Sequence, residues 1–164
     1  MGKETKLLEK IELIVPGYHG YKKKELLRED DRIVRGKVAD TLALARKDIE
    51  RAMQRCAMLN CAQLVAIDTL RKKLMALESR VRHAEAGYSG YFDRISVREK
   101  EIEKLIEYDA KLIETAQAIE EAVKRLNGSM ADPNSLGMAV FELDDKVREL
   151  EELLDRRNHV IMGD

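Results

Sequence analysis

Long apolar runs and aromatic residues are both scarce in this sequence. No apolar run approaches the roughly 18 residues that a membrane span needs. The amino terminus, Met1-Gly2-Lys3-Glu4, lacks the apolar core of a signal peptide. We therefore expect no membrane span and a soluble, cytoplasmic protein. Aromatic residues make up only 4% of the chain and include no tryptophan, so the positions at which they occur are informative.

Cysteine is nearly absent as well. The only two, Cys56 and Cys61, are five positions apart and belong to neither a CxxC pair nor a four-ligand set. Zinc binding and thioredoxin-like chemistry are therefore unsupported. We interpret both as small, buried apolar side chains, which also fits a reducing compartment.

The patterns that usually accompany catalysis are missing too. The sequence contains no Gly-x-Ser-x-Gly elbow, no phosphate-binding glycine loop and no dinucleotide fingerprint. No nucleophile stands beside a plausible base. The sequence predicts no cofactor and favours a non-enzymatic role.

Among the residues that are present, a repeated Gly-Tyr-x-Gly-Tyr pattern is the most distinctive feature. It occurs at residues 17–21 and 87–91, and the two copies hold four of the five tyrosines. We call them the first and second Gly-Tyr loops. Because so few aromatics are concentrated at two glycine-containing breaks, these breaks should matter to folding, to binding, or to both.

Composition indicates one folded domain over residues 1–164. Hydrophobic residues are 45% of the chain, charged residues 37%, and the net charge is −1, which favours amphipathic helices over disorder. Residues 1–86 carry 19 Lys and Arg against 13 Asp and Glu, whereas residues 87–164 carry 11 against 18. We expect the halves to attract each other, within a monomer or between protomers; the alternative is a basic surface for an acidic partner.

Apolar spacing predicts five helices, with heptad-like seams in the long ones. The least marked boundary lies at Leu59-Asn60, where asparagine tolerates a left-handed turn. The alternative is one continuous helix from Lys22 to Ala86, which would make the protein an obligate oligomer. The predicted helices span residues 3–14, 22–57, 61–86, 97–127 and 134–158.

The seam of the fourth predicted helix contains one polar member, Asp109. This carboxylate would be paired, exposed where the helices splay, or responsible for setting the register. We favour pairing with an Arg or Lys of the basic half, residues 1–86.

Short connections should make successive helices antiparallel. We therefore predict an all-α, antiparallel four-helix bundle, resembling a coiled coil, with a short extra amino-terminal helix folded over the tyrosine end. Both Gly-Tyr loops should lie at that end, and both cysteines at the opposite one.

The Gly-Tyr end is the candidate binding site. In a structural interpretation the tyrosines and Phe92 cap the open end of the core, with their hydroxyls hydrated or bonded to backbone. In a functional interpretation the aromatics and the adjacent lysines form a stacking and anion-binding surface for nucleotide or single-stranded nucleic acid. The candidate residues are Tyr18, His19, Tyr21, Lys22, Lys23, Lys24, Tyr88, Tyr91 and Phe92.

A metal site is a third hypothesis for the same end. Topology brings His19, His83 and His159 toward it, with Asp93 or Asp155 as a possible carboxylate ligand. No two histidines have helical ligand spacing and no Glu-x-x-His is present, which argues against a ferritin-like di-iron site.

The stretch Pro16-Gly17-Tyr18-His19-Gly20-Tyr21-Lys22 and the stretch Gly87-Tyr88-Ser89-Gly90-Tyr91-Phe92-Asp93 carry a family resemblance. The chain resembles a group of uncharacterised prokaryotic helical proteins that share a PGYxGYK start and a GYSGxFD turn. The resemblance implies a conserved role for the loops and brings no activity.

Together these observations favour a non-enzymatic helical interaction or scaffold protein. We expect it to self-associate as a homo-oligomer, because its apolar seams exceed what one slender bundle buries, and to dock a protein partner at the Gly-Tyr end. Nucleotide or nucleic-acid binding through the tyrosines and lysines is the alternative, and metal binding is the third.

Overall fold

The computed structural model describes residues 2–21, 27–88 and 99–162. Within these ranges the chain is helical apart from its turns, and the described residues contain no strand. The helices are α1 (Gly2–Ile14), α2 (Leu27–Met58), α3 (Leu64–Tyr88), α5 (Glu99–Gly128) and α6 (Pro133–Met162).

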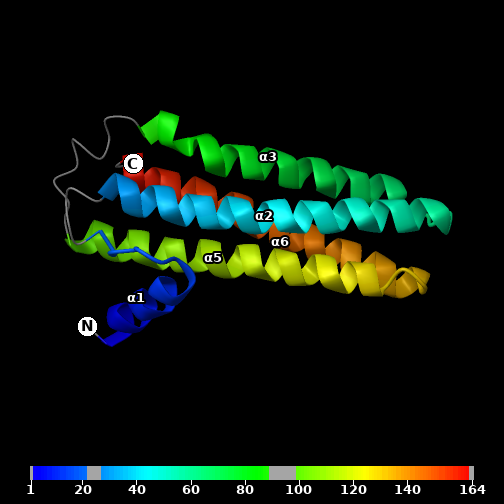
Figure 1. The fold of residues 1–164 in the computed structure, drawn as a ribbon, viewed down its shortest axis with the longest axis horizontal. Helices are drawn as coiled ribbons and strands as arrows, with labels where there is room; N and C mark the ends of the chain where they lie inside the picture. Colours follow the sequence, from blue (N-terminus) through cyan, green and yellow to red (C-terminus); the bar gives the residue numbers. More distant parts are fainter. Residues whose placement is uncertain (1, 22–26, 89–98, 163–164) are drawn as a thin grey trace.

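The four long helices form an antiparallel bundle, which confirms the predicted fold class (Figure 1). Helix α2 packs against α3 and α5, and α6 packs against α5 and α3, so each long helix has two neighbours. The short helix α1 packs on the outside of α5 (Figure 1). Among the described helices, none is long and apolar enough to cross a membrane.

The core follows the heptad-like seams. In α5 and α6 almost every seam position is buried, because alternating steps of three and four residues keep one stripe of the helix against its neighbours. Two seam members, Ile102 and Val140, are only partly buried. The fully or almost fully buried members are Leu105, Asp109, Leu112, Ala116, Ile119, Val123 and Leu126 in α5, and Leu136, Leu143, Val147, Leu150 and Leu154 in α6.

The break between α2 and α3 lies where the sequence predicted it. Asn60 has a left-handed φ of 51°. The N–H of Asn60 donates to the carbonyl of Ala57 at 3.2 Å, and the N–H of Cys61 donates to that of Cys56 at 2.9 Å. This pair of bonds around a left-handed residue is the Schellman motif that ends many helices. The continuous helix from Lys22 to Ala86 is therefore wrong.

The turn between α5 and α6 caps the start of α6. The Asp132 carboxylate accepts hydrogen bonds from the N–H of Asn134 and from the hydroxyl of Ser135. Pro133 is the first helical residue, where its missing N–H costs nothing. The predicted starts of the second helix at Lys22 and of the fourth at Val97 lie outside the described residues.

Ion pairs join the basic and acidic halves of the chain. Lys73 of α3 pairs with Asp144 of α6 at 2.9 Å, and Arg80 of α3 pairs with Asp155 of α6. Lys10 of α1 pairs with a glutamate of α5, Glu114. Attraction between the two oppositely charged halves therefore acts within one monomer.

Candidate functional site

The structure assigns different environments to the predicted site residues. Tyr18 and Tyr21 of the first Gly-Tyr loop are each only 2% exposed, whereas His19 between them is exposed. Tyr88 is the last residue of α3. The predicted residues Lys22, Lys23, Lys24, Tyr91 and Phe92 lie outside the described part of the chain.

Asp109 of α5 holds the two tyrosines in place. Its Oδ2 accepts hydrogen bonds from the hydroxyls of Tyr18, at 3.0 Å, and Tyr21, at 2.6 Å. Its Oδ1 accepts a bond from Nε of Arg157 at 2.8 Å. The predicted pairing of Asp109 is thus confirmed, but its partner is wrong: Arg157 belongs to the acidic half, residues 87–164.

The error has a simple cause. Position 157 of α6 lies beside α5 in the bundle, and the overall charge of a chain half says nothing about one buried side chain. The tyrosine hydroxyls also bond a carboxylate, where the structural interpretation expected water or backbone.

Arg157 extends the hydrogen bonding across the bundle. Its Nη2 donates to the hydroxyl of Tyr21 at 3.1 Å and to Oδ1 of Asp31 at 2.6 Å. The other oxygen of Asp31 accepts from Nε of Arg35 at 2.8 Å, and Nη1 of Arg35 reaches the carbonyl of Val81 in α3 at 3.1 Å. All four long helices and the first Gly-Tyr loop are thereby connected.

We call this set the buried polar network: Tyr18, Tyr21, Asp31, Arg35, Asp109 and Arg157. Every member is at most 3% exposed. Within the network two carboxylates face two guanidinium groups, so its charges balance, which is the condition under which ions are tolerated in a core.

The neighbouring Asp30 shapes the loop itself. Its two carboxylate oxygens accept the backbone N–H groups of His19, at 2.7 Å, and Tyr21, at 2.8 Å. Burial raises the pKa of Asp30, and these two N–H donors oppose the rise. Tyr21 has a φ of 61°, which is uncommon for a residue with a side chain. The Asp30 bond and the network hold it there.

The electrostatics keep the tyrosines protonated. Burial, followed by the nearby Asp109 charge, raises the pKa of both Tyr18 and Tyr21 well above its usual value. Burial also raises the pKa of Asp109, while Arg157 opposes the rise. Protonated hydroxyls act as donors to a carboxylate, so the network works as a structural tie. With both rings buried, neither presents a face on which a base could stack in this conformation.

The three histidines do not form a metal centre in this structure. His19, His83 and His159 are each exposed. Asp155 is engaged with Arg80, and Asp93 is outside the described residues. In the described ranges there is no group of three or more His, Cys, Asp or Glu side chains that could hold a metal ion.

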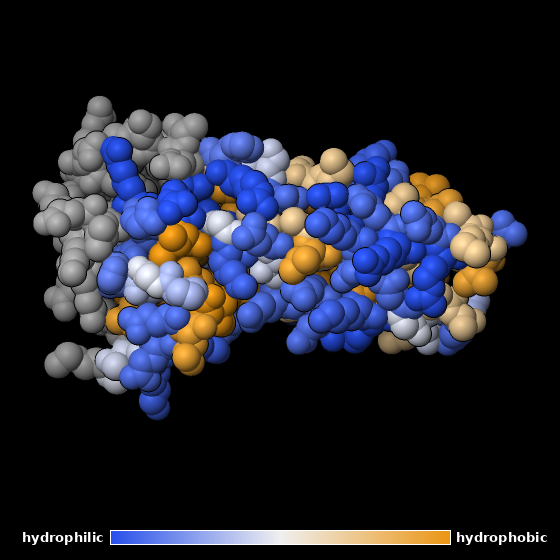
Figure 2. Space-filling view, in the orientation of Figure 1, coloured by the Kyte–Doolittle hydropathy of each residue, from blue (hydrophilic) through white to orange (hydrophobic). Residues whose placement is uncertain are grey.

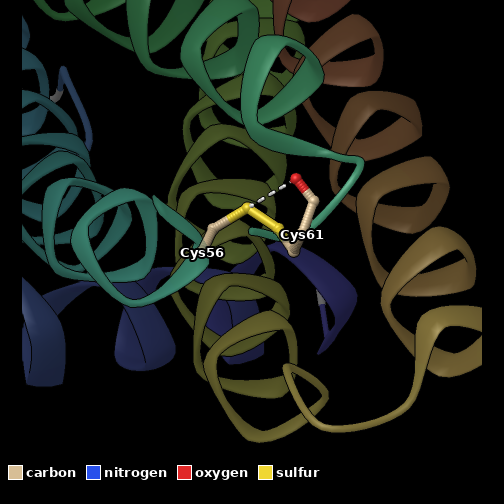
Figure 3. The surroundings of a disulfide bond; sticks show 2 residues. All are labelled: Cys56 and Cys61. Carbon is tan, nitrogen blue, oxygen red and sulfur yellow. Dashed lines mark hydrogen bonds between the residues drawn. A yellow bond between two sulfur atoms is a disulfide. The ribbon is translucent and has the colours of Figure 1, made fainter. Parts of the chain in front are cut away.

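The two cysteines pack in or against the core, as expected for small, buried apolar side chains, but the interpretation missed that they are joined. Cys56 and Cys61 form a disulfide, with their Cα atoms 5.0 Å apart (Figure 3). They occupy the two positions of the Schellman motif whose side chains normally make an apolar contact. That motif, signalled by Asn60, is the sequence feature that would have revealed the pairing. The pair does lie at the end opposite the first Gly-Tyr loop, as expected (Figure 1).

The same end carries a feature that the heptad analysis missed. Five large apolar side chains from the α2–α3 turn, the start of α3 and the start of α6 are 59–83% exposed. Figure 2 shows apolar surface at this end, on the right of the view, and a second apolar patch on the left, where α1 lies. We call this set the distal apolar face: Met58, Leu59, Val65, Met138 and Phe141. The sequence did contain a signal for this face, because these five apolar residues stand at positions outside the seams.

An open groove of about 780 Å³ borders the distal apolar face. Met138 and Phe141 of α6 line it together with Pro133 and with Gln63 from the α2–α3 turn. Arg125 of α5 and Glu142 of α6 also line the groove and pair with each other. The groove therefore joins apolar side chains to a polar rim.

Comparison with protein-family models, with curated proteins and with solved structures finds no match for this chain.

Proposed function

We propose that this protein is a non-enzymatic helical interaction protein that associates with a second copy of itself through the distal apolar face. The observation that carries the proposal is the exposure of five large apolar side chains at one end of the bundle. Large exposed apolar patches on folded proteins usually mark sites of association. The docking surface proposed here differs from the Gly-Tyr end, because Tyr18 and Tyr21 are occupied in the buried polar network.

The magnitude of the apolar contribution fits a reversible dimer. Full burial of one such side chain contributes about 1.5–3 kcal/mol. Because a twofold dimer buries the five side chains of both copies, the apolar contribution is on the order of 20 kcal/mol. Association costs roughly 4–15 kcal/mol in lost freedom of motion. The groove and its rim add contact area toward the roughly 800 Å² that each partner supplies to a standard interface. A weak dimer, dissociating in the micromolar range, is the expected result.

Charge favours a second copy over an oppositely charged partner. In a twofold interface the same patch meets itself, so a rim with one sign of charge would repel its copy. Here the groove is lined by neutral Gln63, Asn134 and Ser135, and the charges of Arg125 and Glu142 neutralise each other. A balanced rim of this kind is compatible with self-association.

Sedimentation velocity over a wide concentration range tests the proposal. The mass of the wild-type protein should rise from monomer toward dimer as its concentration increases. Phe141→Ser removes a 74% exposed side chain that lines the groove. We expect this substitution to weaken the dimer by about tenfold or more, given the apolar area lost.

Leu13→Ser is the matched control. Leu13 is 86% exposed on α1, away from the distal apolar face (Figure 1). It should leave the dimer unchanged. A wild-type chain that stays monomeric at every concentration, or a Leu13 variant as weak as the Phe141 variant, would contradict the proposal. Native mass spectrometry of the same sample adds a second check, because a stoichiometric metal or nucleotide would contradict the non-enzymatic, ligand-free role.

A further inference from the structure

Beyond self-association, the geometry of the α2–α3 turn points to a redox-active site. We propose that Cys56 and Cys61 form a reversible dithiol–disulfide pair that exchanges with small-molecule disulfides of the glutathione type. In this proposal Sγ of Cys61 is the protein atom that reacts first with the small molecule.

The backbone of the turn suits both redox states. The left-handed Asn60 and the two hydrogen bonds from the N–H groups of Asn60 and Cys61 involve no sulfur atom. They hold the Cα atoms of Cys56 and Cys61 5.0 Å apart, a separation that disulfides commonly span. The bond can therefore open and close on the same main-chain framework.

The size of the ring also favours reversibility. The disulfide joins residues only five positions apart, and the entropic contribution of a disulfide grows with the length of the loop it closes. A bond that closes so short a loop, in a turn already fixed by hydrogen bonds, adds less to the stability of the fold than one that closes a long loop. Reduction should then leave the bundle folded.

The two cysteine residues differ in exposure. Cys56 is completely buried, whereas Cys61 is partly exposed at the beginning of the segment that leads into α3. Figure 3 shows Cys56 on the helix and Cys61 on the loop that leads to the next helix. Exchange requires direct approach of the attacking sulfur, so the small molecule must react at Cys61.

Oxidation proceeds in two balanced steps. The thiolate of Cys61 attacks one sulfur of the small disulfide; a mixed disulfide forms, and one small thiolate leaves with the electron pair and takes up a proton. The thiol of Cys56 then loses its proton and attacks Sγ of Cys61, expelling the second small thiolate. Two protein thiols become one disulfide, and one small disulfide becomes two thiols. Reduction is the reverse.

Two single variants test the assignment of roles. Reduced, folded Cys56→Ser and Cys61→Ser proteins are incubated with oxidised glutathione, and intact mass is followed over time. The first variant cannot complete the second step, so it should accumulate one glutathione adduct. It should do so at least about tenfold faster than the second variant, whose remaining thiol is buried. Wild-type protein should end as the internal disulfide without retained glutathione.

Several outcomes would overturn the proposal: equal adduct rates for the two variants, faster reaction of Cys61→Ser, a wild-type end product that keeps glutathione, or wild-type thiols that remain reduced in excess oxidised glutathione. Far-ultraviolet circular dichroism establishes that each variant is folded. Should a variant fail to fold, the same question is answered on wild-type protein by quenching the reaction early with an alkylating agent. Peptide mapping should then find the mixed disulfide on Cys61, and finding it on Cys56 would contradict the assignment.

Discussion

Asp109 is the residue on which the Gly-Tyr end depends. A carboxylate in an apolar seam is costly unless its charge and lone pairs are satisfied. Three donors satisfy Asp109, from Tyr18, Tyr21 and Arg157. The same contacts position the first Gly-Tyr loop against α5 and α6. One polar side chain thus fixes how the loop and these two helices pack at that end of the core.

Asp109→Asn should therefore be strongly destabilising. The substitution removes the negative charge that faces Arg157 and leaves Asp31 as the carboxylate of the buried polar network that still contacts its guanidinium group. Breaking a buried ion pair in this way typically costs about 3–5 kcal/mol. The free energy of unfolding, measured by urea denaturation followed by circular dichroism, should fall by that amount.

Glu114→Gln on the same helix is the control for Asp109→Asn. Glu114 pairs with Lys10 at the surface, where both side chains are about half exposed. Pairs of this kind contribute at most about 1 kcal/mol. Equal losses in the two variants would show that the buried polar network contributes no more than a surface ion pair.

At the scale of elements, α1 is the least anchored helix. It packs on α5 and buries Leu8 and Ile11. The loop that follows it contains Gly20, which has a left-handed φ of 65° and lies against the side chain of Leu8. Only glycine combines that backbone conformation with so close an approach. The docking of α1 thus depends on one glycine as well as on the buried tyrosines.

Gly20→Ala should loosen α1 without unfolding the bundle. The added Cβ would overlap Cδ2 of Leu8, and the left-handed conformation itself costs about 1–2 kcal/mol for a residue with a side chain. Amide hydrogen exchange should become faster across α1 while the protection of α3 and α6 is preserved.

Gly36→Ala is the control for Gly20→Ala, because we expect the same substitution to stabilise the protein at this position. Gly36 lies inside α2, and a Cβ there would meet no atom within 4 Å. Alanine should stabilise the helix by up to about 1 kcal/mol, because it restricts the unfolded chain. If, in contrast, amide hydrogen exchange in α1 of the Gly20→Ala variant is unchanged, Gly20 is not required for the packing of α1 on α5.

At the scale of the whole molecule, the two ends of the bundle have opposite characters. The end with the first Gly-Tyr loop is closed by buried ions and hydroxyls. The other end combines the disulfide with the distal apolar face and a groove. The polar end therefore supports the fold, while the apolar end carries the surface through which we propose that two copies associate.

Alkaline conditions should unfold the whole bundle through the buried tyrosines. The pKa of Tyr18 and Tyr21 is raised in the folded state above the value near 10 of the unfolded chain. Their contribution to stability is complete below about pH 10 and is lost as the pH rises further, because only the unfolded chain releases the protons. Each tyrosine should lower the free energy of unfolding by about 1.4 kcal/mol per pH unit.

The measurement is urea denaturation at a series of pH values above 10, with tyrosinate absorbance recorded in parallel. Lysines also titrate in this range, so the slope is compared with that of the double variant Tyr18→Phe/Tyr21→Phe. The double variant should be less stable at neutral pH and show a shallower alkaline slope. Identical slopes would contradict the raised pKa of both tyrosines.

Periodicity along the chain determined much of the architecture. The seams predicted the four long helices, the short connections predicted their antiparallel packing, and Asn60 marked a helix boundary that the structure confirms. These properties are local, because a seam depends on steps of three and four residues and a turn on a few neighbouring residues. Local signals of this kind are present in the sequence itself.

Only the tertiary structure decided which distant residues meet. The pairing of Asp109 with Arg157, the burial of Tyr18 and Tyr21, and the exposure of Phe141 depend on the lateral order and rotation of helices far apart in the chain. Charge totals predicted the wrong half for the partner of Asp109, because a buried ion pair is selected by geometry and desolvation rather than by net charge. Sequence periodicity specifies which face of each helix is buried, and three-dimensional packing selects the partner it is buried against.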